Sequence, residues 1–274
     1  MLNELRKASE GKLILCFVGT GSAFAKRNAH TSVIIAKNGK AILVDCGTSI
    51  PAALHAKGIK VTDFDGYYFT HSHADHVGGV EELLLMSRYA TKTRPSILIT
   101  ENYEEELWNH TLRGGCEFSD AGRLHLSDYA DLVRPEPLWF TPREFFKAEF
   151  HGIKLRIFRT DHMRTAPGTK RFWSTGLIIE RTVIYSGDTR FDPSLFDQCA
   201  GQVAGRLTSI FHDCQLFSPG AVHASLEELN TLPPHIKDRM YLMHYGDNWE
   251  FFKSQEMGFK DFAEPWKFYE FPLF

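Results

Sequence analysis

Residues 70–79 read THSHADHVGG and place four metal-binding side chains, His71, His73, Asp75 and His76, within six consecutive positions. The segment follows a strand-like stretch and precedes a helix-like one. In a chain with 13 histidines, the chance of such a pattern is on the order of one in several hundred. A solvated histidine cluster on the surface is the alternative, and the pattern favours a metal site.

The spacing within this loop predicts two metal positions rather than one. His71 and His73 are two residues apart, so at the end of an extended segment their rings point to the same side. The turn that follows brings Asp75 and His76 to a second position nearby. Zinc takes at least four ligands and a catalytic site keeps one position for water, so two ions need more ligands than this loop supplies.

Further histidine and aspartate residues occur where the remaining ligands are needed. Three of them stand at or just after predicted strands: His162 after 153–159, Asp188 after 183–186 and His244 at the end of 240–244. Taken alone, a histidine such as His162 is more often structural than a ligand. Together with the loop upstream, these residues become candidate ligands.

The pattern along the chain indicates an α/β fold. Residues 12–18, 31–36 and 41–44 predict an antiparallel meander, with a turn at Asn38 and Gly39. The other predicted strands are 66–70, 96–100, 153–159, 174–180, 183–186, 209–212 and 240–244, and the predicted helices are 50–57, 80–89, one after Pro193 and 225–232. This alternation predicts two sheets with helices outside, in a single domain over residues 1–274.

The segment from about residue 101 to residue 140 is the least legible part of the chain. It contains one acidic helical stretch, the pair Gly114 and Gly115, and scattered prolines. We consider it a candidate cap over the active-site pocket, in which position it would decide the choice of substrate.

Composition excludes several classes of protein. The 274 residues carry a formal net charge of −3, which disfavours binding of large nucleic acids through bulk charge. The five cysteines show no CxxC spacing, so we expect neither a disulfide framework nor a cysteine metal cluster. No apolar run approaches the roughly 20 residues of a membrane span, and the N-terminal run is too short for a secretion signal. We expect a soluble, cytoplasmic protein with no membrane partner.

Four segments of the chain resemble those of a known superfamily. THSHADHVGG, together with TDH at 160–162, SGDT at 186–189 and MHY at 243–245, looks like the metallo-β-lactamase superfamily. The resemblance implies an αββα sandwich, two mixed sheets with helices outside, and metals at the sheet edge. It implies one site of His71, His73 and His162, a second of Asp75, His76 and His244, and Asp188 as the bridge. Two divalent cations are implied, with zinc expected and manganese or iron as alternatives.

Within that superfamily, the chain is similar to the ribonuclease Z-like phosphodiesterase branch. The segments that carry this similarity are FVGTGSAF at 17–24, Arg27 with Asn28, and VDCG at 44–47, in which Asp45 resembles a position close to the metals. Segments HDC at 212–214 and HAS at 223–225 resemble an acidic residue and a histidine that act together. By that match Asp213 orients His223. The alternative is that His223 is only an N-terminal residue of the helix that follows.

The differences from ribonuclease Z narrow the range of expected substrates. No insertion resembles the long arm that grips transfer RNA, and Tyr245, Gly246 and Asp247 follow the last histidine in place of the family's serine-arginine-tyrosine. A small phosphodiester therefore fits better than transfer RNA. The armless relatives include cyclic-nucleotide phosphodiesterases, among them phage enzymes that destroy cyclic pyrimidine signals, so a cyclic mononucleotide is the expected substrate. The resemblance also implies a homodimer.

The expected reaction is attack on phosphorus by a water molecule that the two metals activate. His223, held by Asp213, protonates the leaving ribose oxygen, and Asp75 acts as a catalytic carboxylate as well as a ligand. Three basic residues beyond His162 could reach the phosphate, although a run such as TKRF is more often a solvated turn: Arg164, Lys170 and Arg171.

Other functions remain open at this point. The same metals serve lactone, thioester and β-lactam hydrolases, which attack a carbonyl and do not need the pair of Asp213 and His223. A transfer RNA 3′-processing endonuclease is a further alternative, and a non-catalytic binding module with the same fold is a third.

Overall fold

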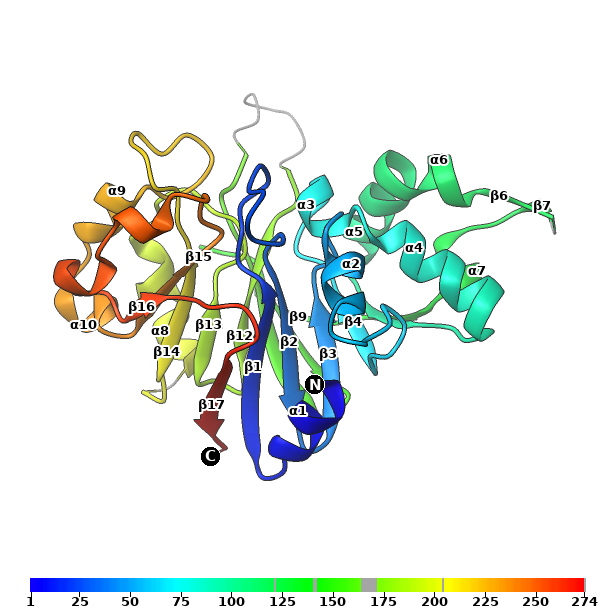
Figure 1. Cartoon of the computed structure of the whole chain (residues 1–274), viewed down its shortest axis with the longest axis horizontal. Helices are drawn as coiled ribbons and strands as arrows, with labels where there is room; N and C mark the ends of the chain where they lie inside the picture. Colours follow the sequence, from blue (N-terminus) through cyan, green and yellow to red (C-terminus); the bar gives the residue numbers. More distant parts are fainter. Residues whose placement is uncertain (121, 140–141, 164–171, 204, 274) are drawn as a thin grey trace.

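Two facing β-sheets with helices on their outer sides make up the molecule (Figure 1). The structure is a computed structural model that describes residues 1–120, 122–139, 142–163, 172–203 and 205–273. Its layers agree with the αββα sandwich expected from the sequence. No helix among these residues is both long and apolar enough to cross a membrane.

The first sheet joins the two ends of the chain. In the order of their pairing, its strands are β17 (Phe268–Pro272), β1 (Lys12–Gly19), β2 (Ser32–Lys37), β3 (Lys40–Val44), β4 (Gly66–Tyr68), β5 (Ser96–Leu98) and β8 (Asp131–Val133). The pairings from β17 to β3 are antiparallel, and those from β3 to β8 are parallel. This sheet is therefore mixed, and its strands β1, β2 and β3 are the predicted meander.

The second sheet comes from the second half of the chain. In the order of their pairing, its strands are β16 (Asp261–Phe262), β15 (Met240–Met243), β14 (Ser209–Asp213), β13 (Val183–Tyr185), β12 (Thr175–Ile179), β11 (Ile153–Arg159), β10 (Phe145–Phe150) and β9 (Glu136–Trp139). Strands β13 to β16 are parallel, and β9 to β13 are antiparallel. The central strands are buried along their whole length, as expected for strands covered on both faces.

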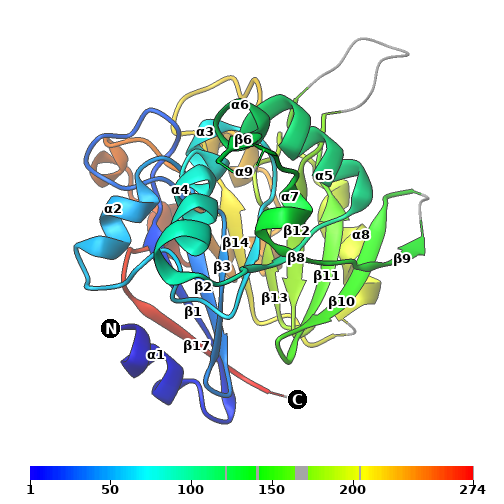
Figure 2. The same ribbon diagram turned by 90° about the vertical axis from the view of Figure 1, so that its right-hand side faces the viewer.

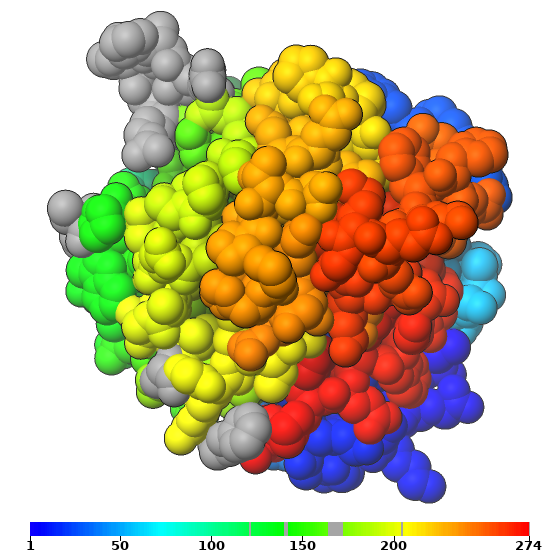
Figure 3. All heavy atoms as spheres, turned by 90° about the vertical axis from the view of Figure 1, so that its left-hand side faces the viewer, coloured from blue at the N-terminus to red at the C-terminus, as the bar shows by residue number. Residues whose placement is uncertain are grey.

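Helices cover the outer face of each sheet. Those on the first-sheet side are α2 (Ile50–His55), α3 (Ala74–Val77), α4 (Val80–Leu85), α5 (Glu101–Leu107), α6 (Arg113–Cys116) and α7 (Leu126–Tyr129), with π-helical turns η1 (Met86–Thr91) and η2 (Trp108–Leu112) (Figure 2). Those on the second-sheet side are α8 (Ser194–Val203), α9 (Leu226–Asn230) and α10 (Pro234–Lys237) (Figure 3). The remaining elements are α1 (Leu2–Ala8), the 3-10 turns η3 (Trp249–Phe251) and η4 (Ser254–Met257), and the small ribbon β6 (Phe118–Ser119) with β7 (Gly122–Arg123).

Hydrophobic packing on both sides of the second sheet holds these layers together. Between the sheets, the Phe17 ring lies 5.1 Å from that of Phe211, and Phe211 lies 5.1 Å from Tyr269. On the outer side, Leu195 and Cys199 of α8 bury a helical stripe against the sheet. The five cysteines are free and buried, which agrees with the absence of a disulfide framework expected from the sequence.

The structure departs from the predicted elements at several positions. Strands β10 and β17 were not predicted, the helix predicted over 80–89 becomes π-helical at Met86, and the helix predicted over 225–232 is shorter. The segment 101–140 contributes short helices to one flank and strands to both sheets. The prediction of one domain over residues 1–274 stays a prediction.

Candidate metal centre

The candidate ligands all lie where strands end at one edge of the two sheets. His71, His73, Asp75 and His76 follow β4, His162 follows β11, Asp188 follows β13, Asp213 ends β14 and His244 follows β15. Strands β11, β13, β14 and β15 run in the same direction, so their carboxyl ends meet at this edge. The fold thus brings together every ligand candidate that the sequence indicated.

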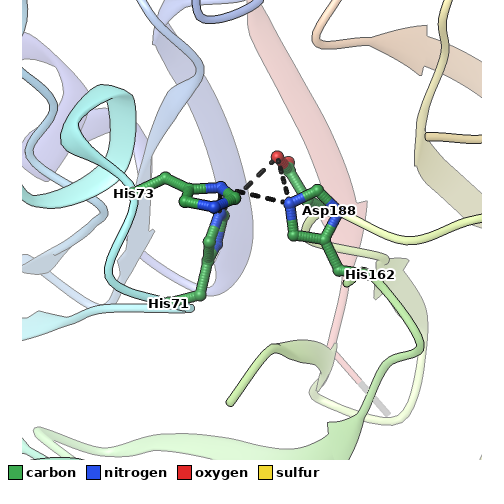
Figure 4. Close-up of side chains that lie close together, drawn as sticks. All are labelled: His71, His73, His162 and Asp188. Carbon is green, nitrogen blue, oxygen red and sulfur yellow. Dashed lines mark hydrogen bonds and ion pairs between the residues drawn. The ribbon is translucent and has the colours of Figure 1, made fainter. Parts of the chain in front are cut away.

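Three histidines and one aspartate form the first cluster (Figure 4). Nε2 of His71 lies 2.9 Å from Nδ1 of His73, and Nε2 of His162 lies 3.1 Å from the same Nδ1. Oδ2 of Asp188 is 3.7 Å from Nε2 of His71. The ligand atoms of all four residues lie within 4.8 Å of one another, a spacing that suits one shared cation.

A second cluster shares the same aspartate. Oδ2 of Asp188 lies 3.3 Å from Nε2 of His76 and 3.4 Å from Nε2 of His244. Oδ2 of Asp75 lies 3.3 Å from Nε2 of His76. Asp188 is thus the one side chain common to both clusters among the described residues, the position that a bridging ligand would take.

The donor atoms of the second cluster fit a cation. Nε2 of His76, Nε2 of His244 and Oδ2 of Asp188 are buried and have no hydrogen-bond partner among the described residues. A buried polar atom without a partner costs about 1–3 kcal/mol, and more if it is charged. A divalent cation would satisfy these atoms at once, so the buried histidine and aspartate clusters fit a metal site.

The electrostatics of the first cluster suit metal binding. Burial lowers the pKa of His73 to about 4 and holds the pKa of His71 well below its ordinary value, so both rings are neutral near pH 7. Burial alone would raise the pKa of Asp188, but His244 and His76 hold it well below its usual range. Neutral imidazole and ionised carboxylate are the forms that bind metals. In the second cluster, burial lowers the pKa of His76 but the charge of Asp188 raises it well above its ordinary value, so a cation there would have to displace a proton.

Asp45 fixes the orientation of the His76 ring. Its carboxylate accepts hydrogen bonds from the backbone N–H of Thr70 at 2.7 Å and the Thr70 hydroxyl at 2.8 Å. It also accepts one from Nδ1 of His76 at 2.7 Å, which leaves Nε2 as the free ligand atom. Asp45 itself has a positive φ of 62°. This agrees with the expected position of Asp45 close to the metals.

Gly47 explains how the ligand loop packs against β3. A Cβ at this position would lie 1.9 Å from the backbone oxygen of Asp75. The flanking residues hold the loop through backbone hydrogen bonds, from Cys46 to His76 and from Thr48 to Ala74. Only glycine permits this close approach.

Asp213 and His223 stand beside the shared aspartate. Nδ1 of His223 donates to Oδ2 of Asp213 at 2.8 Å and lies 3.8 Å from Oδ2 of Asp188. Burial lowers the pKa of His223, but the charge and hydrogen bond of Asp213 outweigh this and raise it to about 9. The imidazole is therefore held in its protonated form near pH 7.

His223 precedes helix α9 without capping it, and its catalytic role stays a prediction. Helix α9 begins after Ser225, whose side chain accepts a hydrogen bond from the backbone N–H of Glu228 in a capping box. His223 lies outside that cap, and its ring is bonded to Asp213 instead.

A hollow of about 480 Å³ lies over the two clusters. Its lining residues come from six separate segments and include His30, Asp75, His162 and His223. No residue of the segment 101–140, over its described positions, lines this hollow, so the expected cap is not found there. Tyr103 instead supports the ligand loop from behind: it accepts a hydrogen bond from Ser72 at 3.3 Å and stacks on Trp173.

Some site residues were not predicted from the sequence, and some predicted ones lie outside the described residues. The backbone oxygen of Val222 accepts a hydrogen bond from Nδ1 of His162 at 2.7 Å and so presents Nε2 to the cluster, yet a carbonyl oxygen leaves no signal in a sequence. His30 of the hollow follows no motif. The three basic residues predicted to reach the phosphate lie outside the described residues: Arg164, Lys170 and Arg171.

The two sheets and the ligand clusters at their shared edge give the chain the metallo-β-lactamase fold with a candidate metal site. Residues 13–269 match the family model described as "Anti-Pycsar protein Apyc1". The anti-Pycsar protein Apyc1 of Paenibacillus xerothermodurans is 37% identical over 256 residues, which cover 92% of this chain and 96% of the relative. The chain belongs to the anti-Pycsar protein Apyc1 family.

Solved structures agree on the fold. A diphosphatase of the PhnP family superposes with a TM-score of 0.63 at 17% identity, covering 95% of this chain and 98% of that chain. A metallo-β-lactamase fold protein from Bacillus subtilis gives a TM-score of 0.62 at 12% identity, covering 94% and 99%. The fold class expected from the sequence is confirmed.

Proposed function

We propose that the chain is a phosphodiesterase with two divalent cations that opens a cyclic nucleotide to a linear nucleoside monophosphate. The observation that carries this proposal is the partly buried hydrogen bond between Asp213 and His223, whose Nδ1 lies 3.8 Å from the aspartate common to both ligand clusters. A thioester hydrolase, whose thiolate leaving group is weakly basic, has no need of this pair, whereas a phosphodiesterase must protonate a basic alkoxide.

The proposed ligands divide between the two positions as the sequence resemblance implied. His71, His73 and His162 would hold one cation, Asp75, His76 and His244 would hold the other, and Asp188 would be shared by both. We expect zinc, which suits imidazole and carboxylate ligands. When bound, the cations lower the pKa of a water molecule and neutralise charge on the non-bridging phosphate oxygens.

His223 acts on the leaving side of the phosphorus. Its Nδ1 is occupied by Asp213, which leaves Nε2 to give a proton to the ribose oxygen as the P–O bond breaks. The ring becomes neutral in this step, and Asp213 keeps it in the orientation needed for the next turnover. Nearby cations would lower the pKa of His223, which makes the ring a better acid.

The chosen substrate class has separate support. The hollow over the clusters, about 480 Å³, suits a small phosphodiester. The net charge of −3 offers little to a long RNA backbone. The relatives are named anti-Pycsar proteins, which agrees with the cyclic nucleotide expected from the sequence.

Hydrolysis assays on the purified, zinc-loaded protein test this proposal. The panel contains 3′,5′- and 2′,3′-cyclic mononucleotides of all common bases, bis-p-nitrophenyl phosphate, a lactone, a thioester and a β-lactam. The blank is the double variant His71→Ala with Asp75→Ala. We expect rapid conversion of at least one cyclic nucleotide, lost in the blank. Cleavage of the carbonyl substrates with all phosphodiesters inert would overturn the proposal.

A further inference from the structure

A second hollow, of about 260 Å³, adjoins the one over the ligand clusters. The two share four lining residues: Ala23, Phe24, Val222 and His223. The second hollow also contains Phe217, and no metal-ligand candidate apart from His244 lines it. The two hollows therefore adjoin each other, with the proposed acid at their boundary.

Two phenylalanines of this second hollow are unusually exposed. The Phe24 side chain is 88% exposed and that of Phe217 is 72% exposed. They come from the loops 20–30 and 215–223, which rise at the same end of the sheets (Figure 1). Exposed aromatic rings that line a hollow mark a surface that a ligand or partner covers.

The loop that carries Phe24 is held in place by its neighbours. The carboxylate of Asp247 accepts hydrogen bonds from the backbone N–H groups of Lys26 at 2.7 Å and Arg27 at 3.0 Å. The backbone N–H of Ser22 donates to the oxygen of Tyr245 at 3.0 Å. Phe24 is thus exposed on a tethered loop.

The loop that carries Phe217 also carries His223 and is tethered in turn. Nε2 of Gln215 donates to the backbone oxygens of Phe217 at 2.8 Å and Pro219 at 3.1 Å. The aromatic ring and the proposed acid thus belong to one structured segment. Binding at Phe217 would place a ligand relative to His223.

The chemistry of the reaction fixes what lies beyond His223. In a cyclic nucleotide, the leaving oxygen stays attached to the ribose, and the ribose carries the base. A proton from His223 reaches that oxygen only if the sugar lies on the His223 side of the phosphorus. The base then extends past His223, away from the ligand clusters and into the second hollow.

We infer that the second hollow binds the nucleobase of the substrate, with Phe24 and Phe217 as the rings against which it stacks. This inference rests on the proposed phosphodiesterase function. Aromatic side chains bind bases through their faces with little regard to sequence. Ser22, Gln215 and Asn248 line the same hollow and supply polar groups for the edge of the base.

Paired substrates test this inference. One is the cyclic nucleotide that the protein hydrolyses fastest; the other is the O-methyl riboside cyclic phosphate with the same phosphodiester ring and no base. In Phe217→Ala and in Phe24→Ala, kcat/KM for the nucleotide is expected to fall about tenfold through KM. The abasic substrate is expected to be hydrolysed as by the parent protein.

Two further variants separate stacking from loop structure. Phe217→Leu keeps an apolar side chain without an aromatic face and should behave as Phe217→Ala does, whereas Phe217→Tyr should restore the parent KM. Phe251→Ala is the matched control, because Phe251 is 86% exposed but lines neither hollow. This variant should hydrolyse both substrates as the parent protein does.

The outcomes distinguish this inference from the proposed function. Equal losses on both substrates, or no loss on either, would overturn base binding while leaving the phosphodiesterase intact. Failure of the parent protein on every phosphodiester would instead overturn the proposed function. Sedimentation of Phe24→Ala adds a further check: a change in oligomeric state with equal losses on both substrates would assign the rings to contact with a second copy of the chain.

Discussion

The two sheets supply the candidate metal centre in different ways. The first sheet contributes one loop after β4, in which four candidate ligands occupy six positions. The second sheet contributes His162, Asp188 and His244 from three separate strand ends. The first contribution is local in sequence, and the second exists only because parallel strand ends meet at one edge. Substitutions in either set of ligands measure how far the two sets depend on each other.

The largest effect is expected where the two contributions meet. Asp188→Asn removes the carboxylate common to both clusters, so turnover should fall by about 10⁴-fold, the scale of several kcal/mol of lost charge stabilisation. Metal analysis should show less than two ions per chain. Asp197→Asn, an exposed aspartate in α8, is the control. Two bound ions and near-normal turnover in Asp188→Asn would mean that the two contributions are independent.

The next effect separates the acid from the metals. His223→Ala should lower turnover of a cyclic nucleotide by about 10²-fold or more, because the ribose oxygen leaves as a strong base without a proton. Bis-p-nitrophenyl phosphate has a weakly basic leaving group and should lose far less. The exposed His235→Ala serves as the matched control. Equal losses on both substrates would argue against an acid role for His223.

A substitution of Asp45 tests how much the ligand loop after β4 depends on the hydrogen bond that orients His76. Asp45→Asn keeps a residue that tolerates positive φ but removes the charge that orients His76. Zinc affinity should weaken by about 10- to 100-fold, as measured by competition with a chelator. The exposed Asp131→Asn provides the comparison. Unchanged affinity would show that the loop needs no such support.

The smallest effect concerns backbone packing. In Gly47→Ala, a methyl group would meet the Asp75 carbonyl, so the loop must shift and the free energy of unfolding should fall by about 1–3 kcal/mol. Gly114→Ala meets nothing within 4 Å and should be neutral or stabilising. Urea titration of the metal-free variants measures both. A Gly47→Ala protein as stable as the parent would contradict the close approach.

The same comparison explains what could be predicted from the sequence. The ligand loop after β4 could be predicted because its ligands are neighbours in the chain. Strands β1, β12 and β13 could be predicted because each is a run of buried apolar residues. Strand β17 escaped prediction because it pairs with β1 from the opposite end of the chain. The carbonyl of Val222 and the exposed Phe217 belong to the site through folding alone, since neither residue type at that position signals a role.

The segment 101–140 shows what amino-acid composition cannot predict. Its polar character predicted a cap over the pocket, yet its described residues line neither hollow. Tyr103 packs behind the ligand loop instead, stacked on Trp173 at 5.7 Å between ring centroids. Polar composition carried no information about which face of the molecule this segment would cover.

The most direct test of the account is anomalous diffraction from crystals of the zinc-loaded protein, recorded on both sides of the zinc absorption edge. We predict two peaks, one among His71, His73 and His162 and one among Asp75, His76 and His244, with the Asp188 carboxylate between them. A single peak, or two peaks that do not share Asp188, would contradict the claim that both sheets build one dinuclear centre.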